Sequence, residues 1–116
     1  MIVDEYIELN TLSENRVSAA RRIYGELKAV IIRSNKNTEL EIFMREPTIS
    51  ILSMRELATG DHYLPLKIES RAEDGQLLRE DNSYWCFNED DIVFKIQGSN
   101  DTRVEIVMRL EVNTNA

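Results

Sequence analysis

The chain has 116 residues, 42% of them hydrophobic and 30% charged, a balance typical of one soluble globular domain. Its 14 basic and 21 acidic residues give a net charge of −7, which disfavours direct binding to nucleic-acid phosphates or to an anionic membrane surface. One cysteine excludes an internal disulfide, and with a single histidine there is no Cys/His ligand set for zinc.

The first part of the chain is expected to be a charged leader ahead of the main body. Alternating apolar side chains over residues 3–12 predict a strand. Residues 13–22 suggest a short helix, because Ser13 can cap its first turn, and a long loop is the alternative. We therefore expect one domain spanning the whole chain, with about residues 1–22 as a charged N-terminal leader.

Period-two alternation then recurs in short segments separated by polar turn residues. Residues 27–33 are apolar on both faces, which is typical of a strand that is covered on both sides or contacts a partner. Further strands are predicted over residues 39–45, 48–54, 63–69, 84–87, 92–97 and 102–112. Pro65 cannot donate a hydrogen bond to a ladder, so its strand is expected at a sheet edge or beside a bulge. The sequence Gly-Ser-Asn-Asp at 98–101 predicts a hairpin between the last two strands.

These segments predict an all-β fold. Seven or eight strands with turn residues between them are best accommodated by two antiparallel sheets packed face to face, a β-sandwich. The alternation leaves a jelly-roll and an immunoglobulin-like topology open.

Residue types that support catalysis are scarce. His62 is expected in an exposed turn, and Cys86, between Trp85 and Phe87, is expected to be a small buried hydrophobic residue. Pairs of acids recur in the predicted loops, where solvated turns are expected rather than a calcium site. We expect no enzymatic activity and no cofactor or metal.

Charge is distributed unevenly along the chain. Residues 13–36 hold six bases and two acids, whereas residues 37–116 hold eight bases and sixteen acids. The basic segment can fold back on its own acids, touch nucleic acid or dock on the acidic face of another copy, and the last of these is a route to rings. The hypothesis for this interface takes Arg16, Arg21, Arg22 and Arg33 as charged partners, with Val30 and Ile32 as apolar anchors.

Aromatic residues gather in the second half of the chain and suggest an alternative function. Tyr63, Tyr84 and Trp85 are candidates for a platform on which sugar rings stack. Successive strand residues point to opposite faces, however, so at least one of Tyr84 and Trp85 is expected in the core or in an interface.

Three segments of the second half carry a resemblance to a known class of proteins. Residues 59–65 read Thr-Gly-Asp-His-Tyr-Leu-Pro, residues 91–96 read Asp-Ile-Val-Phe-Lys-Ile, and residues 101–106 read Asp-Thr-Arg-Val-Glu-Ile. Over about residues 59–116 the chain resembles small β-sandwich virion proteins of tailed bacteriophages, of the head-decoration, neck, tail or fibre-base type.

The resemblance implies a non-enzymatic structural protein. Such a subunit forms a symmetric homo-oligomer, contacts other virion proteins and resides in the virion after synthesis in the host cytoplasm. Residues 1–5 are acidic where a signal peptide is basic, and no apolar run approaches the roughly 20 residues of a membrane span, so export and membrane insertion are not expected. A small acidic protein that binds one host target is a further alternative.

Overall fold

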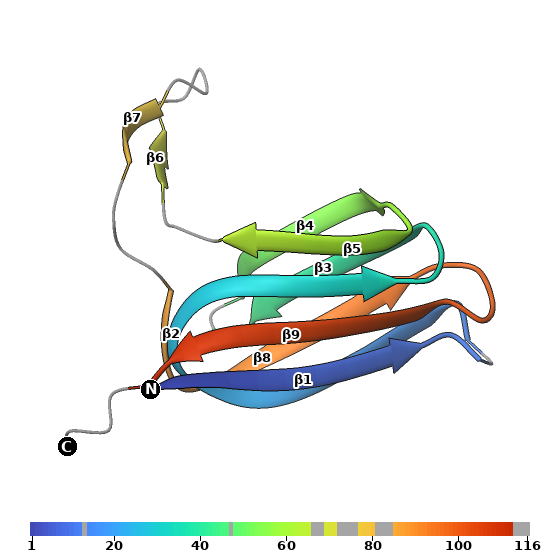
Figure 1. The fold of residues 1–116 in the computed structure, drawn as a ribbon, viewed down its shortest axis with the longest axis horizontal. Coiled ribbons are helices and arrows are strands. Elements are labelled where there is room, and N and C mark those ends of the chain that lie inside the picture. The colour runs from blue at the N-terminus through green and yellow to red at the C-terminus, as the bar shows by residue number, and fades with distance from the viewer. Residues whose placement is uncertain (13, 47, 66–68, 72–76, 81–84, 113–116) are drawn as a thin grey trace.

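The computed structural model describes residues 1–12, 14–46, 48–65, 69–71, 77–80 and 85–112, and this part of the chain is built from strands. The strands are β1 (Ile2–Asn10), β2 (Arg16–Ser34), β3 (Thr38–Met44), β4 (Ile49–Leu57), β5 (Gly60–Pro65), β6 (Glu69–Arg71), β7 (Leu77–Glu80), β8 (Cys86–Gln97) and β9 (Arg103–Glu111). Seven of them form one antiparallel sheet that folds over on itself as a sandwich, and β6 pairs with β7 separately (Figure 1). The predicted all-β, antiparallel sandwich fold is confirmed.

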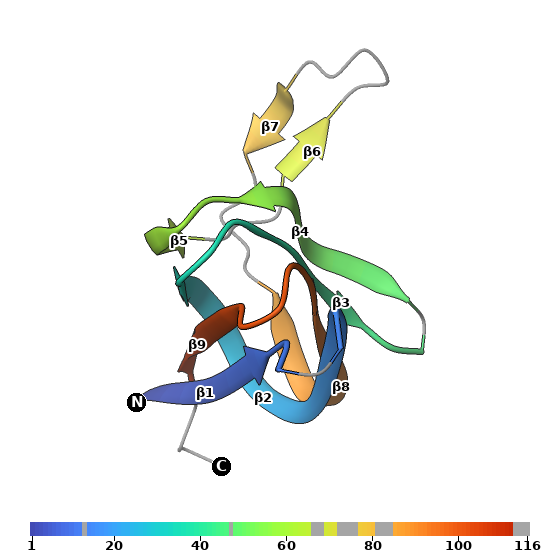
Figure 2. The same cartoon turned by 90° about the vertical axis from the view of Figure 1, so that its right-hand side faces the viewer.

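Strand β2 belongs to both layers of the sandwich. Its last part pairs with β9 and β5, which gives a front layer in the order β1–β9–β2–β5. Its first part pairs with β8, which gives a back layer in the order β2–β8–β3–β4. Nineteen residues at about 3.3 Å each would extend about 63 Å, which exceeds the 41 Å longest dimension of the molecule. The strand must therefore bend, and Figure 2 shows it curving from one layer into the other.

The bend in β2 is built from two irregularities and a glycine. The register shifts between Ile23 and Tyr24 and again between Leu27 and Ala29. Gly25 lies between them with φ +121°, a backbone conformation that side chains disfavour. These features turn β2 around one end of the sandwich.

The core lies between the two layers and is aliphatic with a few aromatic rings. Its largest side chains with less than 2% exposure are Phe94, Ile7, Ile23, Leu27, Ile32, Leu40, Ile42, Leu57, Ile92, Ile96, Ile106 and Met108. The alternation predicted for the last strand is confirmed, since Val104, Ile106, Met108 and Leu110 are buried while Arg103 is exposed. The alternation predicted for β3 is confirmed in the same way, since Leu40 and Ile42 are buried.

The helix expected over residues 13–22 is wrong, and so is the separate leader. Arg16 to Arg22 form the start of β2, while Ser13 lies outside the described residues. Val17 and Ala19 pair with Ile96 and Phe94 of β8 on the core side, so period two governs this segment. Strand β1 pairs with β9 along its whole length. The N-terminal segments are therefore integral parts of the sandwich.

The hairpin expected between the last two strands is also wrong. β8 lies in the back layer and β9 in the front layer, so the turn between them crosses from one layer to the other. The buried hydroxyls of Thr11 and Thr102 both donate hydrogen bonds to the Ser99 carbonyl, and the Thr102 amide donates to Thr11 Oγ1 at 3.0 Å. The connections β1–β2, β2–β3, β4–β5 and β8–β9 all cross at the same end of the molecule (Figure 1).

Two further strand predictions are refined by the structure. Pro65 ends β5, which pairs only with β2 in the described part of the chain, so the predicted edge position is confirmed. The described residues of the segments expected at 84–87 and 92–97 belong to one strand, β8, in which Glu89, with φ +56°, is the extra residue of a bulge opposite β2. Residues 66–68 and 84 lie outside the described residues.

Candidate interaction surface

The outer face of the front layer carries a row of apolar side chains that crosses all four strands. Tyr6 of β1 is opposite Val107 of β9, Val107 is opposite Ile31 of β2, and Ile31 is opposite Tyr63 of β5. Tyr6 is 53% exposed and Tyr63 is 62% exposed, while the two aliphatic residues between them are half-buried. We call these four residues the aromatic row.

Ion pairs between neighbouring strands lie on either side of the aromatic row. Arg33 of β2 donates to both carboxylate oxygens of Asp61 on β5, at 2.8 and 3.4 Å. Arg109 of β9 donates to both oxygens of Asp4 on β1, at 3.1 and 3.2 Å. Each pair joins residues directly opposite in the register, which favours the two-pronged geometry. The hydrogen bond from Arg33 holds the pKa of Asp61 below its usual range.

A third charged group surrounds the Tyr6 hydroxyl. Arg103 lies 2.8 Å from Glu8 and 2.8 Å from Glu105, so it bridges β1 and β9. The Tyr6 hydroxyl donates to Glu8 Oε2 at 3.4 Å. Desolvation, followed by the negative charges of Glu105 and Glu8, raises the pKa of Tyr6 above its usual value. The Tyr6 ring is therefore held in place at one end of the row as a neutral phenol.

The shape of this face suits a broad partner better than a small ligand. Four neighbouring strands at about 4.8 Å spacing place the outer two about 14 Å apart. The hollow beside Tyr6, Ile31 and Arg33 has a volume of about 280 Å³, at the lower limit for a small-molecule site. The face is therefore a broad strip with charges already paired along its margins.

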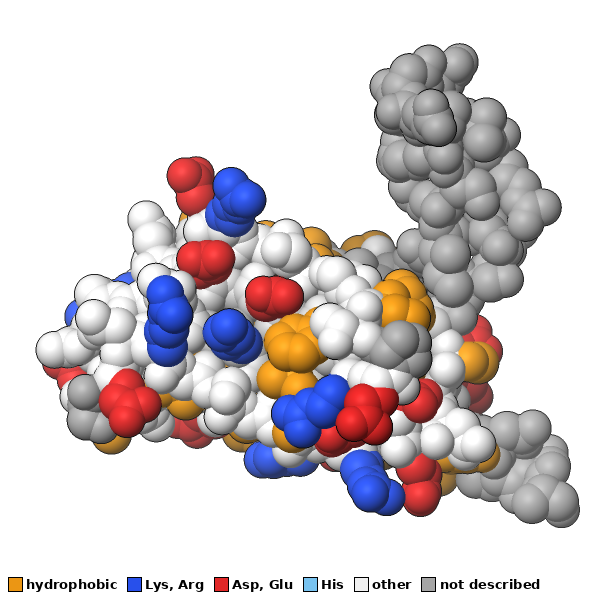
Figure 3. Space-filling model, turned by 180° about the vertical axis from the view of Figure 1, so that it is seen from behind, with side chains coloured by type: hydrophobic (Ala, Val, Ile, Leu, Met, Phe, Trp, Pro, Cys, Tyr) orange, Lys and Arg blue, Asp and Glu red, His pale blue; other side chains and the backbone are white. Residues whose placement is uncertain are grey.

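The outer face of the back layer is different in character. Figure 3, which views the molecule from the side of this layer, shows basic and acidic side chains interspersed with small hydrophobic patches. Lys95 lies opposite both Ser18 and Glu41, and Arg45 pairs with Asp91 at 3.3 Å. Mixed charge is typical of a solvated face.

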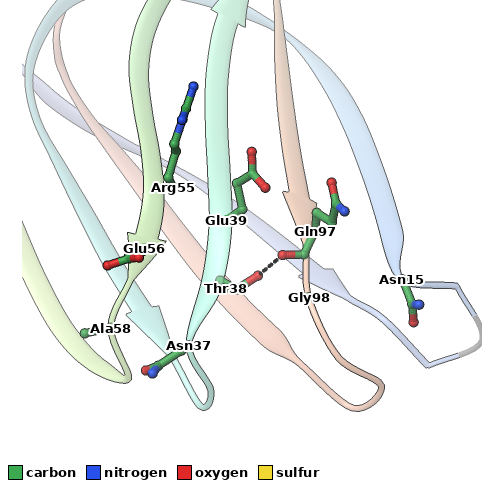
Figure 4. Close-up of a pocket in the computed structure, with 9 residues that line it drawn as sticks. All are labelled: Asn15, Asn37, Thr38, Glu39, Arg55, Glu56, Ala58, Gln97 and Gly98. Carbon is green, nitrogen blue, oxygen red and sulfur yellow. Dashed lines mark hydrogen bonds between the residues drawn. The ribbon is translucent and has the colours of Figure 1, made fainter.

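A wider hollow of about 710 Å³ lies at the end of the back layer where the connections cross. Figure 4 shows Arg55, Glu39 and Gln97 on three neighbouring strands, with Asn15 farther away on the opposite side. Thr38 donates to the Gln97 carbonyl at 2.8 Å and so closes the base of the hollow. Its lining is mainly polar and spread out, which does not match the apolar, converging walls of a ligand pocket.

Two of the predicted interface residues are wrong because they lie in the core. Val30 and Ile32 are fully buried and face Met108 and Ile106 of β9. Both faces of this segment are apolar, so the pattern did not show which residues point outward. Ile31, which lies between Val30 and Ile32 in the sequence, is instead the apolar residue that this segment presents on the outer face.

The four predicted arginines occupy two different places. Arg33 lies on the front layer and is paired with Asp61 of its own chain. Arg16, Arg21 and Arg22 are exposed on the first part of β2, at the edge of the back layer.

Of the three residues predicted as a sugar platform, the structure describes Tyr63 and Trp85, and their surroundings differ. Tyr63 is exposed on β5, whereas Trp85 is half-buried, packs against the core and stacks on Phe87 with ring centres 6.5 Å apart. Tyr84 lies outside the described residues. Tyr6 was missed, although alternation places it outward, because only the strand order aligns it with Tyr63.

The two residues considered for nucleophilic chemistry are also apart. His62 is half-buried on β5, with Nε2 2.8 Å from the Ala58 carbonyl oxygen. Cys86 is exposed, so the expectation that it is buried is wrong. Phe87 faces the core, so the preceding residue, Cys86, points outward.

Comparisons with known proteins give no relative. No family model, no curated protein and no solved structure matches the chain. Within the described ranges, no group of three or more His, Cys, Asp and Glu side chains is placed to hold a metal. Those ranges also contain no helix of the length and apolarity that crossing a membrane requires. The surfaces of the sandwich, above all the aromatic row, are what point to a function.

Proposed function

We propose that the chain is a non-enzymatic structural protein of a tailed-bacteriophage virion, which acts as a subunit of a symmetric assembly. The aromatic row carries this proposal. It presents two exposed tyrosines and two half-buried aliphatic side chains on one face of a four-stranded layer, and the row is buried against a neighbouring virion protein. The resemblance of residues 59–116 to small virion β-sandwiches supports the setting.

The chemistry of the row favours a protein partner. Tyrosine and arginine are enriched at the centres of protein interfaces, because they supply large contact areas together with hydrogen-bonding groups. Arg33 and Arg109 are already paired with carboxylates of their own chain, so covering them leaves no unpaired charge. This pairing lowers the desolvation cost that a partner meets when it covers the row, compared with burying unpaired charges.

Purified particles from the source of this gene test the proposal. The chain should be present in a fixed ratio to the major particle protein. A Tyr6→Ser/Tyr63→Ser variant should fold but remain in the unassembled fraction. Tyr24→Ser is the matched control, because Tyr24 is 48% exposed but lies on the bend of β2, outside the row. Absence of the wild-type chain from particles contradicts the proposal.

A second candidate function, carbohydrate binding, is favoured by one observation. Tyr63 and Tyr6 are exposed on the same face, and charged hydrogen-bonding groups flank them, which is an arrangement suited to stacking and orienting sugar rings. Retention of the chain on an immobilised polysaccharide that is lost on Tyr63→Ala and kept on Tyr24→Ala would favour this function. Retention lost equally in both variants would count against it.

A further inference from the structure

Besides the edges of β4 and β5, two strand edges are unpaired in the part of the sandwich that the structure describes, and these two lie beside each other. β1 pairs only with β9, and the first part of β2, residues 16–23, pairs only with β8. Figures 1 and 2 both place β1 and this part of β2 along the same side of the molecule, one in each layer, and the two strands are in contact. Each edge presents a line of free backbone N–H and C=O groups, which is a template for pairing with another chain.

The two edges carry opposite charge. The acids on β1 are Asp4, Glu5 and Glu8, and the bases on the edge of β2 are Arg16, Arg21 and Arg22. Among described side chains, none forms an ion pair with Glu5 or Arg22, and Arg21 donates only to the adjacent Ala20 carbonyl. Within the described ranges, charge without a partner is therefore available on both edges, at Glu5 and at Arg22.

We propose that two copies of the chain join through these edges, with β1 of each copy antiparallel to the first part of β2 of the other. This interface deepens the assembly role proposed above and rests on it. The two edges lie in different layers and run in opposite directions. A two-fold axis parallel to the strands therefore places each β1 beside the partner's β2. Both pairings form at once, and the dimer is closed.

The connection from β1 to β2 sets the register of this pairing. Only residues 11–15 separate Asn10, at the end of β1, from Arg16, at the start of β2, and the proposed pairing takes these two residues as level along the strands. Rotation about a two-fold axis parallel to the strands does not shift residues along the strand direction. Asn10 therefore lies opposite the partner's Arg16. Counting back along β1 then places Glu5 opposite the partner's Arg21, and Asp4 opposite the partner's Arg22.

The same register matches the two faces of the paired strands. Core-facing Ile7 lies opposite the partner's Ala19, which also faces the core, and outward-facing Tyr6 lies opposite the partner's Ala20. Large residues thus meet small ones. A shift by one residue would set core-facing positions against outward ones, and a shift by two would set Glu5 against Ala19 or Ile23.

A charge exchange between Glu5 and Arg21 tests the interface. By light scattering we expect the purified chain to have twice the mass of one chain. Glu5→Arg alone and Arg21→Glu alone each place like charges opposite one another twice per dimer, and each should raise the dimer dissociation constant by at least about 30-fold. An equimolar mixture of the two variants should restore the dimer, because both of its pairings again join opposite charges.

Two further variants keep the test sharp. Arg55→Glu is the matched control, because Arg55 is exposed on β4 and its substitution makes the same charge change as Arg21→Glu. This variant should remain dimeric, since Arg55 lies away from the edges of β1 and β2. Thermal melting shows which variants fold. If Glu5→Arg does not fold, Glu5→Gln replaces it, because Glu5→Gln should weaken the dimer without adding positive charge.

The outcomes separate this interface from the virion role. A monomeric wild type, a dimer unchanged by both exchanges, or a mixture that stays monomeric overturns the edge pairing. A larger oligomer that neither exchange affects overturns it too, while leaving the assembly role intact. A dimer that responds as expected, from a chain that is absent from purified particles, supports the edge pairing and refutes the virion role.

Discussion

The bend of β2 past the end of β9 can be tested at a single glycine. Gly25 has φ +121°, and a Cβ added there would lie 3.0 Å from the Glu111 carbonyl oxygen and 3.2 Å from Val112 Cγ2. The nearest of these atoms belongs to the backbone, so it cannot move aside by a rotamer change. Gly25→Ala therefore combines an unfavourable backbone conformation with a steric clash.

The size of the effect follows from these two contributions. A residue held in a sparsely populated region costs about 1–3 kcal/mol, and overpacking typically costs a further 1–3 kcal/mol. We expect the free energy of unfolding to fall by about 3 kcal/mol. With an unfolding entropy of about 2.1 cal/mol/K per residue, 116 residues give a loss in Tm of about 12 °C.

Gly60 provides the matched control. It has the same φ of +121°, but a Cβ added there meets nothing within 4 Å. Gly60→Ala should therefore carry only the conformational part of that loss, about 1–2 kcal/mol of the roughly 3 kcal/mol expected for Gly25→Ala, which is a loss in Tm of about 4–8 °C. Thermal unfolding followed by far-ultraviolet circular dichroism measures both variants. Equal losses, or a larger loss for Gly60→Ala, would refute the close packing of the β2 bend against β9.

Three further predictions concern other parts of the sandwich. Gly98→Ala should lower Tm by about 4–8 °C, because its Cβ would lie 2.7 Å from Thr38 Oγ1; an unchanged Tm would contradict the close crossing there. Arg33 depresses the pKa of Asp61, so their pair stabilises the β2–β5 edge above the usual carboxyl pKa, and this contribution is lost as pH falls through the depressed value. The protection factors of the β5 amides, which correct for the intrinsic slowing of amide exchange in acid, should fall on acidification in the wild type, and Asp61→Asn should remove that fall. Ultraviolet titration should show one tyrosine ionising above pH 10.0, and this phase should be missing in Tyr6→Phe.

Much of the fold could be predicted from alternation, because a two-layer sandwich buries every second residue of each strand. Val104 and Ile106 illustrate this, as both are buried as expected. Which strands pair could not be predicted, because strands joined by a crossing between layers show the same alternation as strands joined in a hairpin. The helix expected over residues 13–22 rested on Ser13 as a cap, and Arg21, which interrupts the apolar series just before the bend at Gly25, hides the continuity of this segment with the strand that follows.

The candidate surface was less accessible to sequence reasoning than the fold. Tyr63 could be selected as an exposed aromatic residue, but its alignment with Tyr6 depends on the order β1–β9–β2–β5. The segment around Val30 and Ile32 is apolar on both faces, so its outward side became known only from the register. The basic edge of β2 was apparent as a cluster of charge. Its position beside acidic β1 follows from the connection that folds one strand back along the other.

The most direct test of the edge pairing is the mass of the purified wild-type chain by light scattering, at low salt and near 1 M salt. At low salt we expect twice the mass of one chain. At 1 M the Debye length is about 3 Å, so the attraction between the arginine and carboxylate edges is screened and the mass should fall toward that of one chain. The mass of one chain at low salt over a range of concentrations, or a dimer that salt does not weaken, would contradict association through these charged edges.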